Sequence, residues 1–192
     1  MQKIAIIDFE NNKLLLWQSY MYRVIGFLVF GLLFATILAK QKSIPLITSS
    51  FLDISLPIFQ PFASIILISL DVILVLYLHE LIHALVFYLS NRQKFTIGMR
   101  NGVIFAAAPE HLIAKRVMYI NAFAPFVVIS LLATIGLTFI KTDYIAWFYI
   151  PLVINAGASA GDFMIFIWML QHKKTTLYKD KGGIIEAYTL NT

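Results

Sequence analysis

Four long apolar runs constrain what this chain can fold into more than any other feature of its sequence. Each is long enough for a helix that crosses a lipid bilayer, which takes about 20 apolar residues. Of the 192 residues, 60% are hydrophobic and only 13% are charged, with a mean hydropathy of +0.82. This composition excludes a soluble enzyme and a nucleic-acid-binding module. We predict a single all-α membrane domain over residues 1–192, with transmembrane helices at about 24–39, 62–90, 119–140 and 146–170.

Positive charges lie mostly on one side of these predicted spans. Twelve of the 15 lysines and arginines precede span one, follow span four or lie between spans two and three. Only Lys40, Lys42 and Lys141 lie on the other side. Because basic residues gather in cytoplasmic loops, we predict a multi-pass protein of the cell membrane with both termini in the cytoplasm. The lipid bilayer then accounts for the net charge of +5 without a nucleic-acid partner.

The segment from Lys94 to Ala108, between spans two and three, differs from the rest of the chain. Apolar and other residues alternate from Phe95 to Arg100, and Asn101-Gly102 precedes a second β-prone run. Asn-Gly between two such runs is typical of a tight hairpin. We predict a short β-hairpin on the cytoplasmic side of the membrane, with an irregular loop as the alternative.

The second span contains the sequence His79-Glu80-Leu81-Ile82-His83, an H-E-x-x-H motif. Residues i and i+4 share a helix face, so two imidazoles can bind one Zn²⁺ while the intervening Glu80 acts as general base. The chain has no cysteine, and any metal must therefore be bound by His, Asp or Glu. The alternative is a polar helix end whose histidines reach the membrane surface.

A catalytic zinc site usually has three protein ligands, which requires one more beside the two histidines. Asp162 is the acidic residue of span four, and we expect it about 13 Å from the end of that span. His83 lies about 10 Å from the same side of the membrane, at a similar depth. Asn155 shares the helix face of Asp162 and is a candidate for substrate binding. The other candidate third ligands are Asp71, whose role stays open, and Glu110, His111, His172 and Glu186.

On these residues the chain resembles the membrane-embedded zincin peptidases, a family of metallopeptidases related to the site-two proteases. The resemblance rests on His79–His83 and on the segment Asn155–Asp162, and more loosely on the hairpin and Ala124-Pro125. Site-two proteases usually have a proline before, or a glycine after, the acidic ligand. The sequence here is Gly161-Asp162-Phe163, and this departure bears chiefly on the role of Asn155.

The resemblance implies that His79, His83 and Asp162 bind Zn²⁺, that Glu80 is the catalytic base, and that the substrates are membrane proteins or membrane-associated peptides. We therefore predict a zinc-dependent intramembrane endopeptidase. Two alternatives remain, a catalytically silent membrane scaffold and a metal-binding or metal-transport protein. Glu80 separates them, because hydrolysis needs its carboxylate while scaffolding and transport do not.

Overall fold

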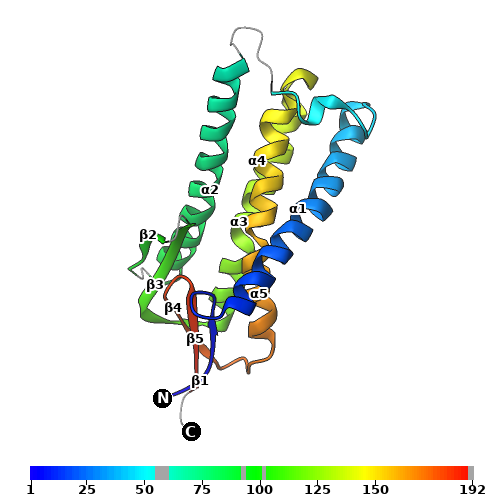
Figure 1. Cartoon of the computed structure of the whole chain (residues 1–192). Helices are drawn as coiled ribbons and strands as arrows, with labels where there is room; N and C mark the ends of the chain where they lie inside the picture. The colour runs from blue at the N-terminus through cyan, green and yellow to red at the C-terminus, as the bar shows by residue number, and fades with distance from the viewer. Residues whose placement is uncertain (55–60, 92–93, 101–102, 190–192) are drawn as a thin grey trace.

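The apolar runs form long helices that account for most of the chain (Figure 1). The computed structural model describes residues 1–54, 61–91, 94–100 and 103–189. The helices are α1 (Lys13–Lys42), α2 (Pro61–Asn91), α3 (Lys115–Phe139), α4 (Ile145–Ala158) and α5 (Ala160–Leu170), with the short 3-10 helices η1 (Ser49–Phe51) and η2 (Thr142–Tyr144).

Four helical segments in the described part of the chain are long and apolar enough to cross a membrane. Three of them agree closely with the predicted spans, whereas the first begins well before residue 24. Its start is set by Asn12, whose side-chain oxygen accepts a hydrogen bond from the Leu15 backbone N–H at 3.0 Å. The segments are Lys13–Lys42, Phe62–Ser90, Lys115–Phe139 and Thr142–Leu170.

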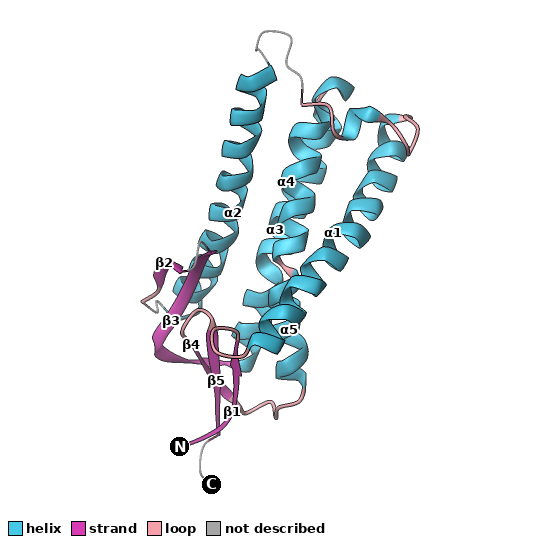
Figure 2. Ribbon diagram, viewed as in Figure 1, coloured by secondary structure: helices cyan, strands magenta, loops and turns pink. Residues whose placement is uncertain are grey.

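The fold is mostly helical, as predicted, but it also has a small antiparallel sheet, larger than the predicted hairpin, at one end of the helices (Figure 2). Its strand order is β1-β5-β4-β3-β2, and both ends of the chain contribute strands. Strand pairing between residues so far apart leaves no local signal in the sequence. The strands are β1 (Gln2–Asp8), β2 (Thr96–Arg100), β3 (Val103–Ala114), β4 (Leu177–Asp180) and β5 (Ile184–Thr189).

The hairpin expected between the second and third long helices is present as the pair β2 and β3. Thr96 lies opposite Ala107, and Arg100 lies opposite Val103. The Asn101-Gly102 turn that suggested the hairpin lies outside the described residues. β3 also extends past the predicted end at Ala108, and its second half pairs with β4. The hairpin is therefore one edge of the larger sheet.

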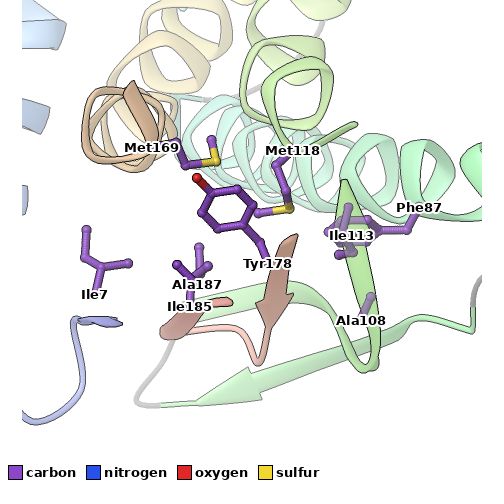
Figure 3. Close-up of a cluster of buried hydrophobic side chains, with 9 residues drawn as sticks. All are labelled: Ile7, Phe87, Ala108, Ile113, Met118, Met169, Tyr178, Ile185 and Ala187. Carbon is purple, nitrogen blue, oxygen red and sulfur yellow. The ribbon is translucent and has the colours of Figure 1, made fainter. Parts of the chain in front are cut away.

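A buried cluster joins the sheet to the helices (Figure 3). Tyr178 of β4 is fully buried, and its ring lies beside Met118 of α3 and Met169 of α5. Burying an aromatic ring of this size stabilises the fold by roughly 1.5–3 kcal/mol. The cluster holds the sheet against the ends of α2, α3 and α5, and its members are Ile7, Phe87, Ala108, Ile113, Met118, Met169, Tyr178, Ile185 and Ala187.

Candidate metal centre

Three side chains from two helices meet in the interior of the molecule. His79 and His83 lie one turn apart on α2, and Asp162 lies in the first turn of α5. The Nε2 atoms of the two histidines are 3.2 Å apart. Asp162 places Oδ2 3.2 Å from Nε2 of His79 and Oδ1 3.4 Å from Nε2 of His83. These three residues can therefore offer one ligand atom each to a single metal ion.

The spacing of these atoms suits a tetrahedral ion. Bonds of about 2.0–2.1 Å at tetrahedral angles place neighbouring ligand atoms roughly 3.3 Å apart. The two histidine Nε2 atoms are 3.2 Å apart, close to that value, and each lies within 3.4 Å of one of the two Asp162 carboxylate oxygens. Two imidazoles and one carboxylate are also a donor set that Zn²⁺ accepts in catalytic sites. The residues present thus fit zinc in both chemistry and geometry.

Each histidine has a second partner that favours metal binding. The Nδ1 atom of His79 lies 2.9 Å from Oδ1 of Asn155, and Nδ1 of His83 contacts Oδ1 of Asn121. A ring that donates its Nδ1–H to an amide oxygen leaves the Nε2 lone pair free. Two such lone pairs facing each other at 3.2 Å would repel without a cation between them. With this tautomer, the arrangement suits a metal ion between the two rings.

Small residues around Ser159 allow α1 to pack closely against the junction of α4 and α5. Ser159 separates α4 from α5, and its Oγ donates to the Asn155 carbonyl oxygen at 3.0 Å. A Cβ atom added to Gly157 would lie 2.6 Å from the ring of Phe27 on α1. The two helices therefore pack closely at this glycine.

Glu80 lines the same cavity as the candidate ligands and is hydrogen-bonded to the sheet. Its Oε2 accepts a hydrogen bond of 2.8 Å from the backbone N–H of Ala106 on β3. Glu80, His79, His83 and Asp162 all line one cavity of about 720 Å³. A carboxylate in that position can exchange protons with a molecule bound in the cavity.

The other candidate third ligands lie elsewhere in the fold. His111 accepts from the backbone N–H of Lys94 at 3.3 Å, and His172 lies 3.2 Å from the Tyr178 hydroxyl. Glu186 forms ion pairs with Lys181 and Lys3 at 2.9 and 3.3 Å. Glu110 is exposed on β3, and Asp71 lies outside the described lining of the cavity.

Asn155 is fully buried behind His79, and it is not among the described residues that line the cavity. Its contact with Nδ1 of His79 favours a positioning role, and its role in substrate binding stays a prediction. Sequence reasoning missed the equivalent role of Asn121, although an asparagine in an apolar span at this depth was a usable signal.

Sequence reasoning also missed the acidic side chain of Asp180. Asp180 of β4 lines the cavity and is 9% exposed, and its Oδ1 accepts from the Gly182 backbone N–H at 2.8 Å. Burial raises the pKa of Asp180 to about 7. No sequence motif marks this residue, because it reaches the cavity only through the pairing of β4 with β3 and β5.

Comparison with known proteins agrees with the chemistry of this centre. No curated protein and no solved structure matches the chain. The proposed relation to the site-two proteases stays a prediction. One family, described as "Putative zincin peptidase", matches residues 72–177, a segment that contains the H-E-x-x-H motif and Asp162. Because the match covers more than half of the chain, this protein belongs to that zincin peptidase family.

Proposed function

We propose that this protein is a zinc-dependent intramembrane endopeptidase, which cleaves membrane proteins or membrane-associated peptides. One observation carries the proposal: the ligand atoms of His79, His83 and Asp162 lie within 4.8 Å of one another, and these residues line the same cavity as Glu80. Membership of a zincin peptidase family supports the same reaction class.

The roles of the residues follow from their positions. When bound, Zn²⁺ supplies Lewis acidity toward a water and a substrate carbonyl. Ala106 holds Oε2 of Glu80, so we expect Oε1 to accept the proton of the attacking water. Glu80 then returns that proton to the amide nitrogen as the carbon–nitrogen bond breaks. Asn155 and Asn121 keep the histidine rings oriented throughout.

The walls of the cavity support an apolar substrate. Leu16 and Tyr20 of α1 line it together with Ile73 and Leu76 of α2. Both helices are long and apolar enough to cross a membrane. Moving from lipid into such a cavity would cost an apolar substrate segment less free energy than it would cost a polar one.

The edge of β3 that faces the cavity, opposite β2, supports binding of the substrate in an extended conformation. Ile104, Phe105 and Ala106 line the cavity, and β2 pairs with the opposite edge of this stretch. A peptide bond in a helix is protected by its own hydrogen bonds, so the substrate must unwind before it is cut. We propose that an unwound segment adds to this edge of β3 beside the metal centre.

We also propose that the protein lies in the cell membrane with its sheet on the cytoplasmic side. The termini lie at the sheet end, where β1 pairs with β5 (Figure 1). The sequence segments rich in lysine and arginine flank or form this same end, as expected for cytoplasmic loops.

Zinc content and cleavage, measured on the same purified variants, test the function. We expect about one zinc per chain in the unsubstituted protein and loss of zinc in Asp162→Ala and His79→Ala. Glu80→Gln should keep its zinc but cleave single-span peptides in liposomes at least about 100-fold more slowly. Glu110→Gln, which removes an exposed carboxylate from β3, is the matched control.

Each other outcome favours a different function. Equal cleavage by Glu80→Gln and the unsubstituted protein would overturn the peptidase proposal. Bound zinc without cleavage of any peptide would favour the metal-binding alternative. A purified protein that binds no zinc would favour the scaffold.

A further inference from the structure

A single arginine lies inside the cavity that holds the metal centre. Arg23 of α1 is the only lysine or arginine among the described residues that line this cavity. Its Nη2 lies 3.8 Å from the position that a Cβ atom on Gly161 would occupy. Gly161 directly precedes the candidate ligand Asp162, so the guanidinium lies at the start of α5, in the cavity that the candidate ligands also line.

Arg23 has no anionic partner within the described part of the chain. Its Nε is buried and forms no hydrogen bond there, and its guanidinium carbon lies 5.8 Å from the centre of the Tyr20 ring. A charged group in an apolar helix is costly unless it is paired or reaches water. An arginine that only anchored α1 at the membrane surface would extend its head group outward. Arg23 instead lines the cavity, and its donors are available to a bound molecule.

Apart from Arg23, the charged side chains that line the described cavity are acidic. A bound anion is therefore favoured beside Arg23 and not elsewhere in this lining. The carboxylates of Glu10, Glu80 and Asp180 also line the described cavity, as does Asp162. With Asp162 and Glu80 offsetting the charge of a bound zinc ion, Arg23 is the cationic side chain of the described cavity that can attract a negatively charged group of a substrate. Guanidinium forms two parallel hydrogen bonds with a carboxylate, which is the anion that peptides carry.

We infer that Arg23 determines specificity by binding a carboxylate of the peptide substrate beside the metal centre. The inference rests on the proposed peptidase function and goes beyond it, because it names a charged group in an otherwise apolar substrate. The carboxylate has two possible sources, an acidic side chain near the cleaved bond or the free C-terminus of a peptide.

Binding of four labelled octapeptides distinguishes these sources without requiring turnover. The peptides consist of alanine and leucine, with Asp or Asn at a central position and a C-terminal carboxylate or amide. Each is titrated, by fluorescence anisotropy in detergent, against zinc-loaded Glu80→Gln protein that carries Arg23, Arg23→Gln or Arg23→Lys. Arg116→Gln removes an exposed charge from the start of α3 and serves as the matched control.

We expect Arg23→Gln to weaken binding of carboxylate-bearing peptides about tenfold and to leave the neutral peptide unchanged. Arg23→Lys, which keeps the charge but not the two-pronged geometry, should recover part of the loss. A loss confined to the Asp peptides assigns the carboxylate to a side chain, and one confined to the free-acid peptides assigns it to the C-terminus. Unchanged zinc content in Arg23→Gln verifies that the site is intact.

Several results would overturn the inference. These are equal binding of all four peptides to the Arg23 and Arg23→Gln proteins, an equal loss in Arg116→Gln, or no binding of any peptide. The peptidase proposal is tested separately by incubating the same peptides with protein that retains Glu80. Arg23-dependent binding without cleavage would contradict the peptidase proposal alone, and cleavage without Arg23-dependent binding would contradict this inference alone.

Discussion

The two ring nitrogens of each metal-centre histidine have different partners. Nε2 faces Asp162, while Nδ1 contacts an asparagine oxygen on α3 or α4. An amide oxygen orients the ring and selects its tautomer without adding a negative charge. A neutral partner suits the charge balance of the site, because Asp162 and Glu80 already offset the two positive charges of a zinc ion. A carboxylate in place of either asparagine would add a buried negative charge with no cation to offset it.

Asn121 should therefore matter for zinc affinity although it is not a ligand. In Asn121→Ala we expect the dissociation constant for zinc to rise about 10- to 100-fold, since His83 loses its orienting partner. Competition with a fluorescent zinc chelator measures this constant. Ser130→Ala, which removes a buried hydroxyl from the same helix, should leave it unchanged. An unaltered zinc affinity in Asn121→Ala would show that ring orientation does not depend on this contact.

At the scale of single residues, the sequence identifies the candidate metal ligands better than it identifies the residues that orient them or line the cavity around them. His79, Glu80 and His83 form a motif within one helix turn, and Asp162 was found by matching its depth to theirs. The cavity positions of Arg23 and Asn121 depend on how α1 and α3 are rotated against their neighbours. Hydropathy gives the length of such helices but not the angle at which each side chain meets another helix.

At the element scale, β3 forms different contacts along its two halves. Its first half pairs with β2 on one edge and faces Glu80 on the other, where Ala106 donates its N–H. Its second half pairs with β4 from Ala108 onward. Because backbone groups alternate along an antiparallel strand, the N–H of Ile104 faces the same side as that of Ala106. This edge is therefore the available template for an added strand.

Ile104→Pro removes that backbone donor while leaving the β2 ladder intact, because the ladder uses the other edge. If substrate adds to β3, this variant should cleave peptides about fivefold to tenfold more slowly, through a higher KM, at unchanged zinc content. Ile104→Ala shortens the side chain but keeps the backbone N–H. It therefore separates the effect of losing the side chain from the effect of losing the hydrogen-bond donor. Cleavage by Ile104→Pro at the rate of Ile104→Ala would exclude strand addition at this position.

Elements with local signals were predicted, and elements defined by distant pairing were not. The four apolar helices and the β2–β3 hairpin follow from hydropathy and from alternation over a few residues. β1 and β5 pair residues as far apart as Gln2 and Thr189. No local signal pairs β1 with β5. Gly182-Gly183 is a tight-turn signal for the β4–β5 pair that sequence reasoning missed, so the five-stranded sheet became visible only in the structure.

At the scale of the whole molecule, Glu80 and the candidate metal centre lie toward the end of the helices that carries the sheet. The sheet and both termini lie at the same end of the helices, and the sheet contacts Glu80 directly (Figure 1). The opposite end has the loop between α1 and η1, where Ile47 is 95% exposed. This polarity means that the orientation of the molecule in a membrane decides from which side water and released products reach the metal centre.

The absence of cysteine makes that orientation measurable with single introduced thiols. Lys174→Cys places an exposed thiol at the sheet end, after α5, and Ile47→Cys places one at the opposite end. With the sheet in the cytoplasm, a membrane-impermeant maleimide added to intact cells should label Ile47→Cys, and should label Lys174→Cys only after permeabilisation. The reverse pattern would invert the proposed topology. It would also move the expected site of product release to the outer face, because the sheet and the metal centre it contacts move together.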